Sequence, residues 1–326
     1  MRTRRDFLAG CPACLPAWPL PLRAQDRGRQ RRVAYLGTSS ASQHLLDAFL
    51  LGLNELGWSV GRNLILDVRL TQGDPARVGA LTQELMGLRP DLFVATTDTY
   101  VRAAVNLGTA VPIVFVLGFD PIGLGVVKAL SRPGGHATGF AVLNWELNPK
   151  RLSLLKEALP RLDRVGVLYR DDDPRVRPAL EQAEQAGRAL QILLIRAPIQ
   201  RAEDFEAVFQ RLAQAGARGL IGVADNLFFQ SRQRLADLAL QHRLAATIGA
   251  VEFADAGMLM AYAVDFKPVF SRAAVLVDRI LNGAEPSDIP VEIANAYEFV
   301  VNLRTARALG IALPRSLRLQ ATRVIE

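Results

Sequence analysis

Short apolar runs alternate with amphipathic segments along most of this chain of 326 residues, and the series occurs twice. In the first series the predicted strands are residues 32–37, 64–70, 91–96 and 112–117, and the predicted helices are 43–56, 75–88 and 99–107. Apolar runs of this length between helical segments are typical of parallel strands that helices cover on both faces. The first part of the chain is therefore predicted to be a three-layer α/β/α lobe.

The same order of elements begins again near residue 164. Strands are predicted at 164–169, 191–195, 219–224 and 245–249, and helices at 176–188, 203–215 and 231–242. The chain then continues with a strand (258–264), a helix (269–281), a strand (297–301) and a short helix (303–309). If these last elements complete both units, the first lobe is 31–141 plus about 253–292, and the second is 142–252 plus about 293–326. The fold class is then α/β, with two similar lobes, parallel sheets, a three-crossing hinge and a ligand cleft between the lobes.

Residues 1–25 differ from everything that follows. Arg4 and Arg5 begin a twin-arginine export pattern, a proline-broken apolar stretch follows, and Ala24 supplies a small residue for cleavage. This segment predicts an export signal and a periplasmic location. Cys11 and Cys14 both lie within it, so the mature chain is expected to have no disulfide. The apolar run before Cys11 is short, which disfavours the alternative of a lipid anchor there.

Several function classes find no support in the composition and motifs. The formal charge is +7, but the arginines are scattered, whereas nucleic-acid binding favours a basic stripe with interleaved aromatic residues. His44, His136 and His242 lie far apart and make no metal set. The chain has no Gly-x-Ser-x-Gly elbow and no His-Glu-x-x-His motif. We therefore expect no enzyme activity, no cofactor, no metal and no nucleic-acid partner.

Five glycines occur between residues 119 and 140. Gly123 and Gly125 imitate the start of a dinucleotide fingerprint, but Lys128 stands where the third glycine belongs, and the chain contains no Gly-Lys-Ser/Thr tripeptide. Pro133 and the two glycines after it favour a turn. The stretch is therefore predicted to be a cleft loop, a helix and the approach to the hinge rather than a phosphate cradle.

The residues around this stretch resemble a known family. The matching segments are Pro112 to Phe115, Asp120 with Pro121, Gly125, Ser131 to Gly135, Thr138 with Gly139, Ala224 to Asn226, Met258 to Asp265, Asp288 to Pro290, Asn302 with Leu303, and Val324 to Glu326. Residues 31–326 resemble the ABC transporter substrate-binding proteins of the periplasmic-binding-protein type I superfamily, and look closest to a subgroup that includes tryptophan and tyrosine binders. His136 stands where this pattern has asparagine.

The resemblance implies a monomeric receptor that captures a small molecule by hinge closure and delivers it to the membrane permease of an ABC importer. It also implies an amino acid or a related carboxylate as the ligand, with an aromatic one as an option. An exported sensor input module of the same fold remains the alternative function. A regulator of this fold would need DNA-binding helices at its amino end, where the export signal stands instead.

Ligand-binding residues are expected in loops at the carboxyl ends of the strands. The candidates are Thr38, Ser39, Ser40, Thr96, Thr97, Asp98, Phe119 and Asp120 in the first lobe, and Tyr169, Asp225, Asn226 and Ala250 in the second. Hydroxyl groups and backbone N–H groups at helix starts suit a carboxylate, although the same hydroxyls also serve as helix caps. Asp225 ends a buried strand and is expected to meet an ammonium group. Tyr100 either stacks on an aromatic ligand or belongs to a helix surface.

Overall fold

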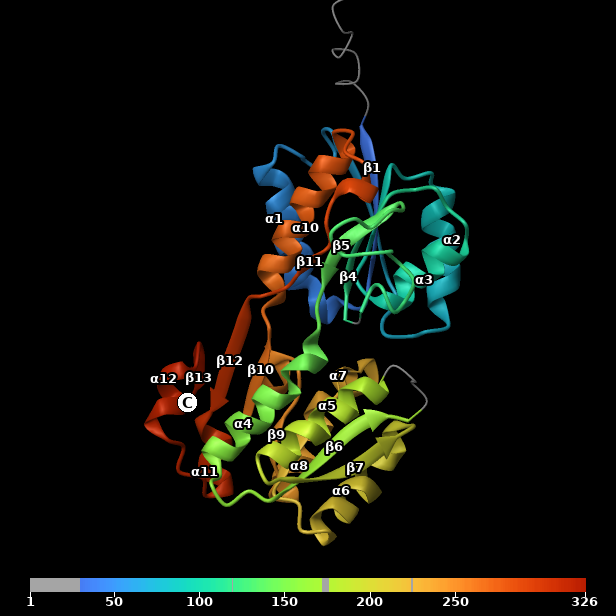
Figure 1. The fold of residues 1–326 in the computed structure, drawn as a ribbon. Helices are drawn as coiled ribbons and strands as arrows, with labels where there is room; N and C mark the ends of the chain where they lie inside the picture. Colours follow the sequence, from blue (N-terminus) through green and yellow to red (C-terminus); the bar gives the residue numbers. More distant parts are fainter. Residues whose placement is uncertain (1–29, 119, 172–175, 224) are drawn as a thin grey trace, which may run out of the picture.

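The computed structural model describes residues 30–118, 120–171, 176–223 and 225–326. These residues form two lobes, one above the other in Figure 1. Each lobe contains a parallel sheet with helices on both faces. The alternating sequence pattern thus predicted the fold class correctly.

The first lobe is built on one six-stranded sheet in the order β11-β5-β4-β3-β1-β2. Its strands are β1 (Arg31–Gly37), β2 (Leu64–Leu70), β3 (Leu92–Ala95), β4 (Ile113–Leu117), β5 (Ala137–Ala141) and β11 (Glu292–Ile293). All neighbouring strands are parallel. Their carboxyl ends therefore lie at one edge of the sheet, where parallel α/β proteins bind ligands.

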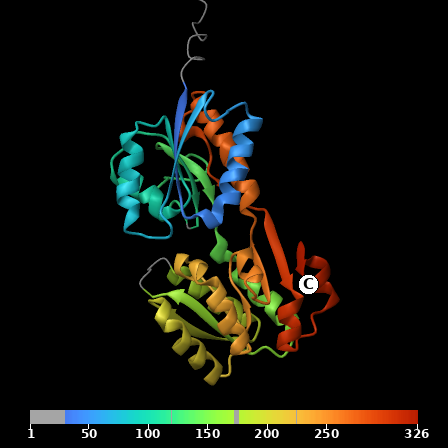
Figure 2. The ribbon, with the colours of Figure 1, turned by 180° about the vertical axis from the view of Figure 1, so that it is seen from behind.

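Alternate side chains of this sheet pack on two helical layers. Val33 and Tyr35 of β1 belong to the core beneath α1 (Gln43–Glu55) and α10 (Phe266–Leu281), which lie side by side in Figure 2. Ala34 and Leu36 belong to the core beneath α2 (Arg77–Gly87) and α3 (Asp98–Asn106). A strand turns successive side chains to opposite faces, so continuous apolar runs fit a sheet covered on both sides.

No helix in the described residues is long and apolar enough to cross a membrane.

The second lobe has a four-stranded parallel sheet in the order β7-β6-β8-β9. The strands are β6 (Arg164–Arg170), β7 (Leu193–Ile199), β8 (Gly219–Gly222) and β9 (Ala245–Thr247), and the helices of the lobe are α4 (Asn148–Ala158), α5 (Val176–Ala189), α6 (Phe205–Gln214), α7 (Asn226–Gln230), α8 (Arg232–Gln241) and α9 (Val251–Asp255). Helices α4 and α5 cover one face of this sheet, and α6 and α8 cover the other. Short 3-10 helices are η1 (Ser40–Ser42), η2 (Asn144–Leu147), η3 (Ala202–Asp204) and η4 (Pro286–Asp288).

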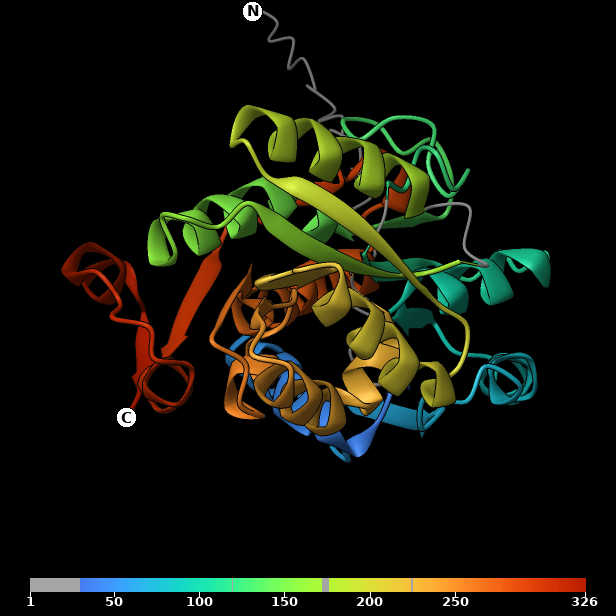
Figure 3. The same ribbon diagram turned by 90° about the horizontal axis from the view of Figure 1, so that it is seen from below.

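A separate three-stranded sheet extends the second lobe. Strand β10 (Met260–Val264) pairs antiparallel with β12 (Tyr297–Asn302), and β12 pairs parallel with β13 (Arg323–Ile325). Helices α11 (Leu303–Leu309) and α12 (Arg315–Gln320) accompany these strands, and the C-terminal part projects to one side in Figure 3.

The position of β10 corrects one expectation about the lobes. Residues from about 253 were expected in the first lobe, but Phe253 and Met258 pack in the core beneath α6 and α8, and Met260 packs in the core beneath α4 and α5. The chain returns to the first lobe only with α10, whose Phe270 and Val277 belong to that lobe's core. Pairing of β10 with the distant strand β12 determines this placement, and the order of elements along the chain does not reveal it.

The chain passes between the lobes three times: after β5, between β10 and α10, and between β11 and β12. Arg151 links the first two passages because its guanidinium donates to Asn148 Oδ1 at 2.7 Å and to the Tyr262 carbonyl at 2.8 Å. The Tyr262 ring stacks on Tyr297, which begins the strand after the third passage. Burial lowers the pKa of Arg151 to about 9, because an apolar surrounding disfavours its charge. On the second-lobe side, all three passages are thus held together.

Residues 120–136 form turns and contain no helix, contrary to the prediction. The Asp120 carboxylate accepts the Ile122 N–H at 2.9 Å, and Gly125 and Gly134 both adopt φ of 69°. Positive φ values are incompatible with a regular right-handed helix, so the glycines interrupt the helical pattern that the apolar residues suggested.

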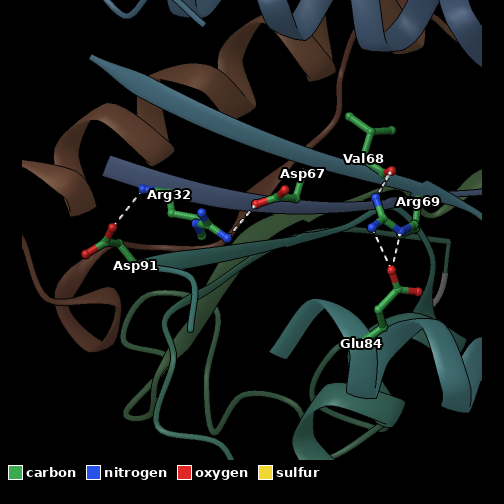
Figure 4. Close-up of polar contacts among 6 residues, drawn as sticks. All are labelled: Arg32, Asp67, Val68, Arg69, Glu84 and Asp91. Atoms are coloured by element: carbon green, nitrogen blue, oxygen red, sulfur yellow. Dashed lines mark hydrogen bonds and ion pairs between the residues drawn. The ribbon is translucent and has the colours of Figure 1, made fainter. Parts of the chain in front are cut away.

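Polar contacts surround the first two strands of the first-lobe sheet (Figure 4). The Asp91 carboxylate accepts the backbone N–H of Arg32 at 2.7 Å, and the Arg32 guanidinium lies 3.5 Å from Asp67. Arg69 on edge strand β2 donates to Glu84 on α2 at 2.6 and 2.8 Å. Charged side chains on an edge strand discourage pairing with another sheet.

Candidate ligand-binding site

A cleft of about 1080 Å³ lies between the two lobes. The residues that follow β1, β3 and β4 line its first-lobe wall, and the residues that follow β8 and β9 line its second-lobe wall. Phe266 and Phe270 of α10 complete the lining. The cleft therefore lies at the carboxyl ends of both parallel sheets, where loops lead into helices.

The structure brings many of the expected ligand residues together around this cleft. They are Thr38, Ser39, Thr96, Thr97, Asp98, Asp225, Asn226 and Ala250. These eight residues come from both lobes and are distant in sequence. Their contact with a ligand remains a prediction.

Four expected residues do not contribute to this lining or cannot be placed. Ser40 is exposed within η1, and Asp120 is exposed with its carboxylate engaged in the turn at Ile122. Tyr169 is 8% exposed and lines a separate cavity of about 470 Å³ beside α5. Phe119 lies outside the described residues.

Two hydroxyl groups of the first-lobe wall are buried and have no hydrogen-bond partner among the described residues: Ser39 Oγ and Thr97 Oγ1. Ser39 precedes η1 and Thr97 precedes α3, yet neither side chain caps the helix that follows it. Thr96, by contrast, donates to the Leu36 carbonyl at 3.0 Å. A buried hydroxyl without a partner is costly, so both groups are available for a hydrogen bond to a ligand.

The second-lobe wall presents acidic groups. Asp225 accepts the Leu227 N–H at 2.7 Å through Oδ1 and caps α7. Glu252, in the first turn of α9, also lines the cleft. Its carboxylate lies 4.0 Å from His44 Nε2 on α1 of the first lobe.

Apolar and aromatic side chains form part of the remaining surface. Tyr35 packs against Phe49 with ring centroids 5.7 Å apart, and Phe229 meets Phe253 edge to face at 6.3 Å. Burial raises the pKa of Tyr35, and nearby Tyr100 raises it further, so the Tyr35 phenol stays neutral. The cleft can thus accommodate an apolar group as well as polar ones.

Tyr100 belongs to neither of the surroundings considered from the sequence. It is 3% exposed within the core beneath α2 and α3, and its hydroxyl lies 2.7 Å from Thr71 Oγ1. The strand-to-helix order placed it one turn into a helix, but only the packing shows that it faces the core.

Several cleft residues were missed by the sequence reasoning. They are Gln43, Arg102, Phe229, Gln230, Phe253, Phe266 and Phe270. Arg102 follows Asp98 by four residues on α3, a spacing that shares one helix face and could have indicated it. Phe266 and Phe270 have no such signal, because they reach the cleft only through the return of α10 to the first lobe. No cluster of metal-ligating side chains occurs in the described part of the chain.

Comparison with known proteins gives this geometry a context. Residues 38–325 match the model of a family described as ABC transporter substrate binding protein. A tyrosine-binding protein from Clostridioides difficile (strain R20291) is 22% identical over 264 residues, which cover 81% of this chain and 75% of that protein.

Solved structures share the two-lobed fold. A conserved domain protein from Vibrio cholerae O1 biovar eltor superposes with a TM-score of 0.83 at 25% identity, over 91% of this chain and 100% of that one. An ABC domain from Streptococcus pneumonia in complex with L-Trp gives 0.83 at 20% identity, with the same coverage. A ligand-free, open substrate-binding protein with adhesive properties from Clostridium difficile gives 0.70 at 19% identity, over 91% and 99%.

Proposed function

The chain belongs to the family of ABC transporter substrate-binding proteins, and from this premise we propose that it is the exported solute-binding component of an ABC importer. In this proposal an amino acid or a related carboxylate enters the cleft, and the lobes close on it about the three passages of the chain. The closed form, stabilised by the ligand, is then delivered to a membrane permease. The receptor acts as a monomer in the periplasm.

The pair of unpartnered hydroxyls is the observation that carries the ligand class. Ser39 Oγ and Thr97 Oγ1 are buried donors in the wall of the cleft, and each stands at the start of a helix. The second of these helices, α3, has nine residues and directs its first backbone N–H groups towards its amino end. Hydroxyl donors beside the positive end of a helix favour an anion, and a carboxylate fits the available hydrogen bonds.

The rest of the cleft fits the remainder of an amino acid. The second-lobe wall carries two carboxylates, those of Asp225 and Glu252, one of which receives an ammonium group, and the aromatic residues of both lobes supply an apolar surface for a side chain. Two relatives support an aromatic side chain, since one is a tyrosine-binding protein and one was solved with L-Trp. We therefore propose L-tyrosine and L-tryptophan as the first ligands to test.

A thermal-shift screen of the chain from residue 25 onward tests this function. The screen compares amino acids, other small carboxylates, nucleosides and sugars. A ligand at about 100 times its dissociation constant stabilises the folded state by about 2.7 kcal/mol, which raises the melting temperature measurably. We expect a shift with one or a few amino acids, the aromatic ones first.

The methyl ester of the same amino acid is the matched control, because it keeps the ammonium group and the side chain but loses the anionic carboxylate. We expect the ester to give a much smaller shift. An equal shift with the ester would contradict a carboxylate site at Ser39 and Thr97. A shift with sugars or nucleosides alone would replace the proposed ligand class with another.

A further inference from the structure

Two acidic side chains of the second lobe face the cleft, but they differ in their existing bonds. Asp225 Oδ1 already accepts the Leu227 N–H at 2.7 Å and caps α7. The Glu252 carboxylate accepts no hydrogen bond from any described residue, and the one basic side chain within 4.0 Å of it in that part of the chain is His44. Glu252 therefore has more acceptor capacity left for a ligand than Asp225 has.

The contact with His44 also fixes where the Glu252 carboxylate lies. His44 is the second residue of α1 and belongs to the first lobe, whereas Glu252 belongs to α9 of the second lobe. Gln43 and Ser42, which directly precede His44, line the same cleft as Ser39. The Glu252 carboxylate thus reaches across the cleft to the first-lobe wall that carries an unpartnered hydroxyl.

This position makes Glu252 sensitive to what enters the cleft. The Glu252 side chain is 29% exposed, so a ligand beside it removes much of its remaining water. A carboxylate that loses water needs a cation or hydrogen-bond donors in exchange. The 4.0 Å separation between the Glu252 carboxylate and His44 Nε2 is too long for a hydrogen bond, so His44 does not donate to Glu252 in this structure.

We propose that Glu252 receives the ammonium group of the ligand and thereby makes the cleft select amino acids over the same molecules without the amino group. This inference rests on the proposed function, in which the cleft binds an amino acid by its carboxylate. The carboxylate of the ligand lies at Ser39 and Thr97, and its ammonium group lies between the first-lobe wall and Glu252. The ligand then contacts both lobes through opposite charges and draws them together.

A second role for Glu252 would predict a different result. If Glu252 only bridges the lobes through His44, its loss weakens every ligand alike, and the loss of His44 does the same. Glu252→Gln and His44→Gln are therefore a matched pair of variants. Asp225→Asn is the third variant, because asparagine keeps the cap of α7 while removing the charge.

The test is isothermal titration calorimetry on the purified protein with two ligand pairs. The pairs are L-tyrosine with 3-(4-hydroxyphenyl)propionate and L-tryptophan with indole-3-propionate. In Glu252→Gln we expect amino-acid affinity to fall about tenfold or more, as for a lost charged hydrogen bond, while affinity for the deamino acid is maintained or increased. His44→Gln and Asp225→Asn are expected to retain the wild-type preference for the amino acid.

Three results would overturn the inference: a Glu252→Gln protein with the wild-type preference, equal losses for all ligands in Glu252→Gln and His44→Gln, or a preference abolished by Asp225→Asn instead. If the wild type binds none of the four ligands, the proposed ligand class fails by itself. Tyramine and tryptamine then decide the role of Glu252, since they carry the ammonium group without the carboxylate. If the wild type binds either amine and Glu252→Gln does not, the inference is supported. If the wild type binds neither amine, or if Glu252→Gln binds them equally well, the inference is overturned.

Discussion

The two lobes use the residues at the starts of their cleft-facing helices in different ways. In the first lobe, Ser39 and Thr97 stand at N-cap positions, but neither hydroxyl accepts a hydrogen bond from its own helix. In the second lobe, the Asp225 carboxylate caps α7. A cap residue whose oxygen is already bonded stabilises the scaffold, whereas one whose oxygen is unpartnered in a cleft can serve a ligand. Residue type alone does not distinguish these two uses.

The lobes also differ in what surrounds one glycine of each parallel sheet. A Cβ atom at Gly139 of β5 would lie 2.0 Å from the Phe115 carbonyl oxygen of β4, and Gly139 has φ of 156°. A Cβ atom at Gly222 of β8 would instead lie 3.1 Å from the Ile248 side chain. The first lobe is constrained here by backbone, and the second by a side chain that can move.

The largest effect is therefore expected from Gly139→Ala, with Gly222→Ala as its counterpart in the other lobe. The backbone of β4 must move to admit the methyl group, so we expect Gly139→Ala to lose about 4 kcal/mol or more of folding free energy. Gly222→Ala is expected to lose about 1–2 kcal/mol, as for modest overpacking. Urea unfolding followed by circular dichroism measures both. Equal losses would show that the two sheets are constrained alike.

The next effect concerns a filled cap in the second lobe. Asn302 is 4% exposed, accepts the Thr305 N–H at 3.1 Å and donates to the Ala254 carbonyl at 3.0 Å. Asn302→Ala removes a cap and one of the two hydrogen bonds that the Ala254 carbonyl accepts, the other coming from the Gly257 N–H, so we expect a loss of about 2 kcal/mol. Asn302 does not line the cleft, and ligand affinity is expected to stay unchanged.

Asn282→Ala is the matched control for this variant. Asn282 is exposed in the first lobe and donates to Asp278 at 2.8 Å. We expect its loss to change the free energy of unfolding by no more than about 0.5 kcal/mol. A similar cost at both positions would mean that burial of the Asn302 bonds contributes little. The same unfolding titration, with calorimetry for affinity, measures both variants.

Most of the fold follows from the sequence because it depends on local patterns. The apolar runs located β1, β3 and β4 within one or two residues, since strands buried on both faces are continuously apolar. Strand β10 was assigned to the wrong lobe because its position depends on pairing with β12, more than thirty residues away. The helix predicted within residues 120–136 is absent for a local reason. Two glycines there adopt positive φ, which outweighs the apolar pattern.

The candidate site was predictable only where it follows from strand order. Thr38, Thr97 and Asp225 line the cleft because they follow strands whose carboxyl ends lie at one edge of a parallel sheet. Tyr169 is the last residue but one of β6 and faces a different cavity, whereas Arg170 at the end of the strand lines the cleft, because successive side chains of a strand point to opposite faces. Glu252 lies two residues beyond the predicted Ala250, in a segment that was expected to face the cleft, but its approach to His44 depends on how the two lobes face each other.

Removal of the two unpartnered hydroxyls of the first lobe is expected to change stability less, but to weaken ligand binding clearly. The double variant Ser39→Ala, Thr97→Val removes both unpartnered hydroxyls. We expect ligand affinity to fall about tenfold or more, while the free energy of unfolding stays the same or rises by up to about 1 kcal/mol. Calorimetry and urea unfolding on the same preparation separate the two quantities.

Thr82→Val is the control for this double variant. Thr82 is buried in the first lobe, donates to the Val78 carbonyl at 2.7 Å and does not line the cleft. Its loss is expected to lower stability by about 1 kcal/mol without changing affinity. A double variant that loses stability and keeps its affinity would show that Ser39 and Thr97 act as caps after all, and the difference between the lobes would disappear.

The smallest effects are expected at the exposed edge strands, where the lobes are alike. Arg69 on β2 pairs with Glu84 at 2.6 Å, and Arg196 on β7 pairs with Glu184 at 2.7 Å. The hydrogen bond to its glutamate raises the pKa of each arginine. Exposed ion pairs contribute little because water and salt screen them, so Arg69→Ala and Arg196→Ala should each cost no more than about 0.5 kcal/mol.

Unfolding at low and high salt checks this last pair of variants. If both variants lose a small and equal free energy of unfolding that shrinks with salt, the edge strands of the two lobes behave alike. The lobes would then differ at their helix starts and at the glycines of their sheets, and not at their edges. Arg69 also donates to the Val68 carbonyl at 2.9 Å. A loss above about 1 kcal/mol at Arg69 alone, insensitive to salt, would mean that this backbone bond stabilises β2, since ionic screening weakens the ion pair far more than a neutral acceptor.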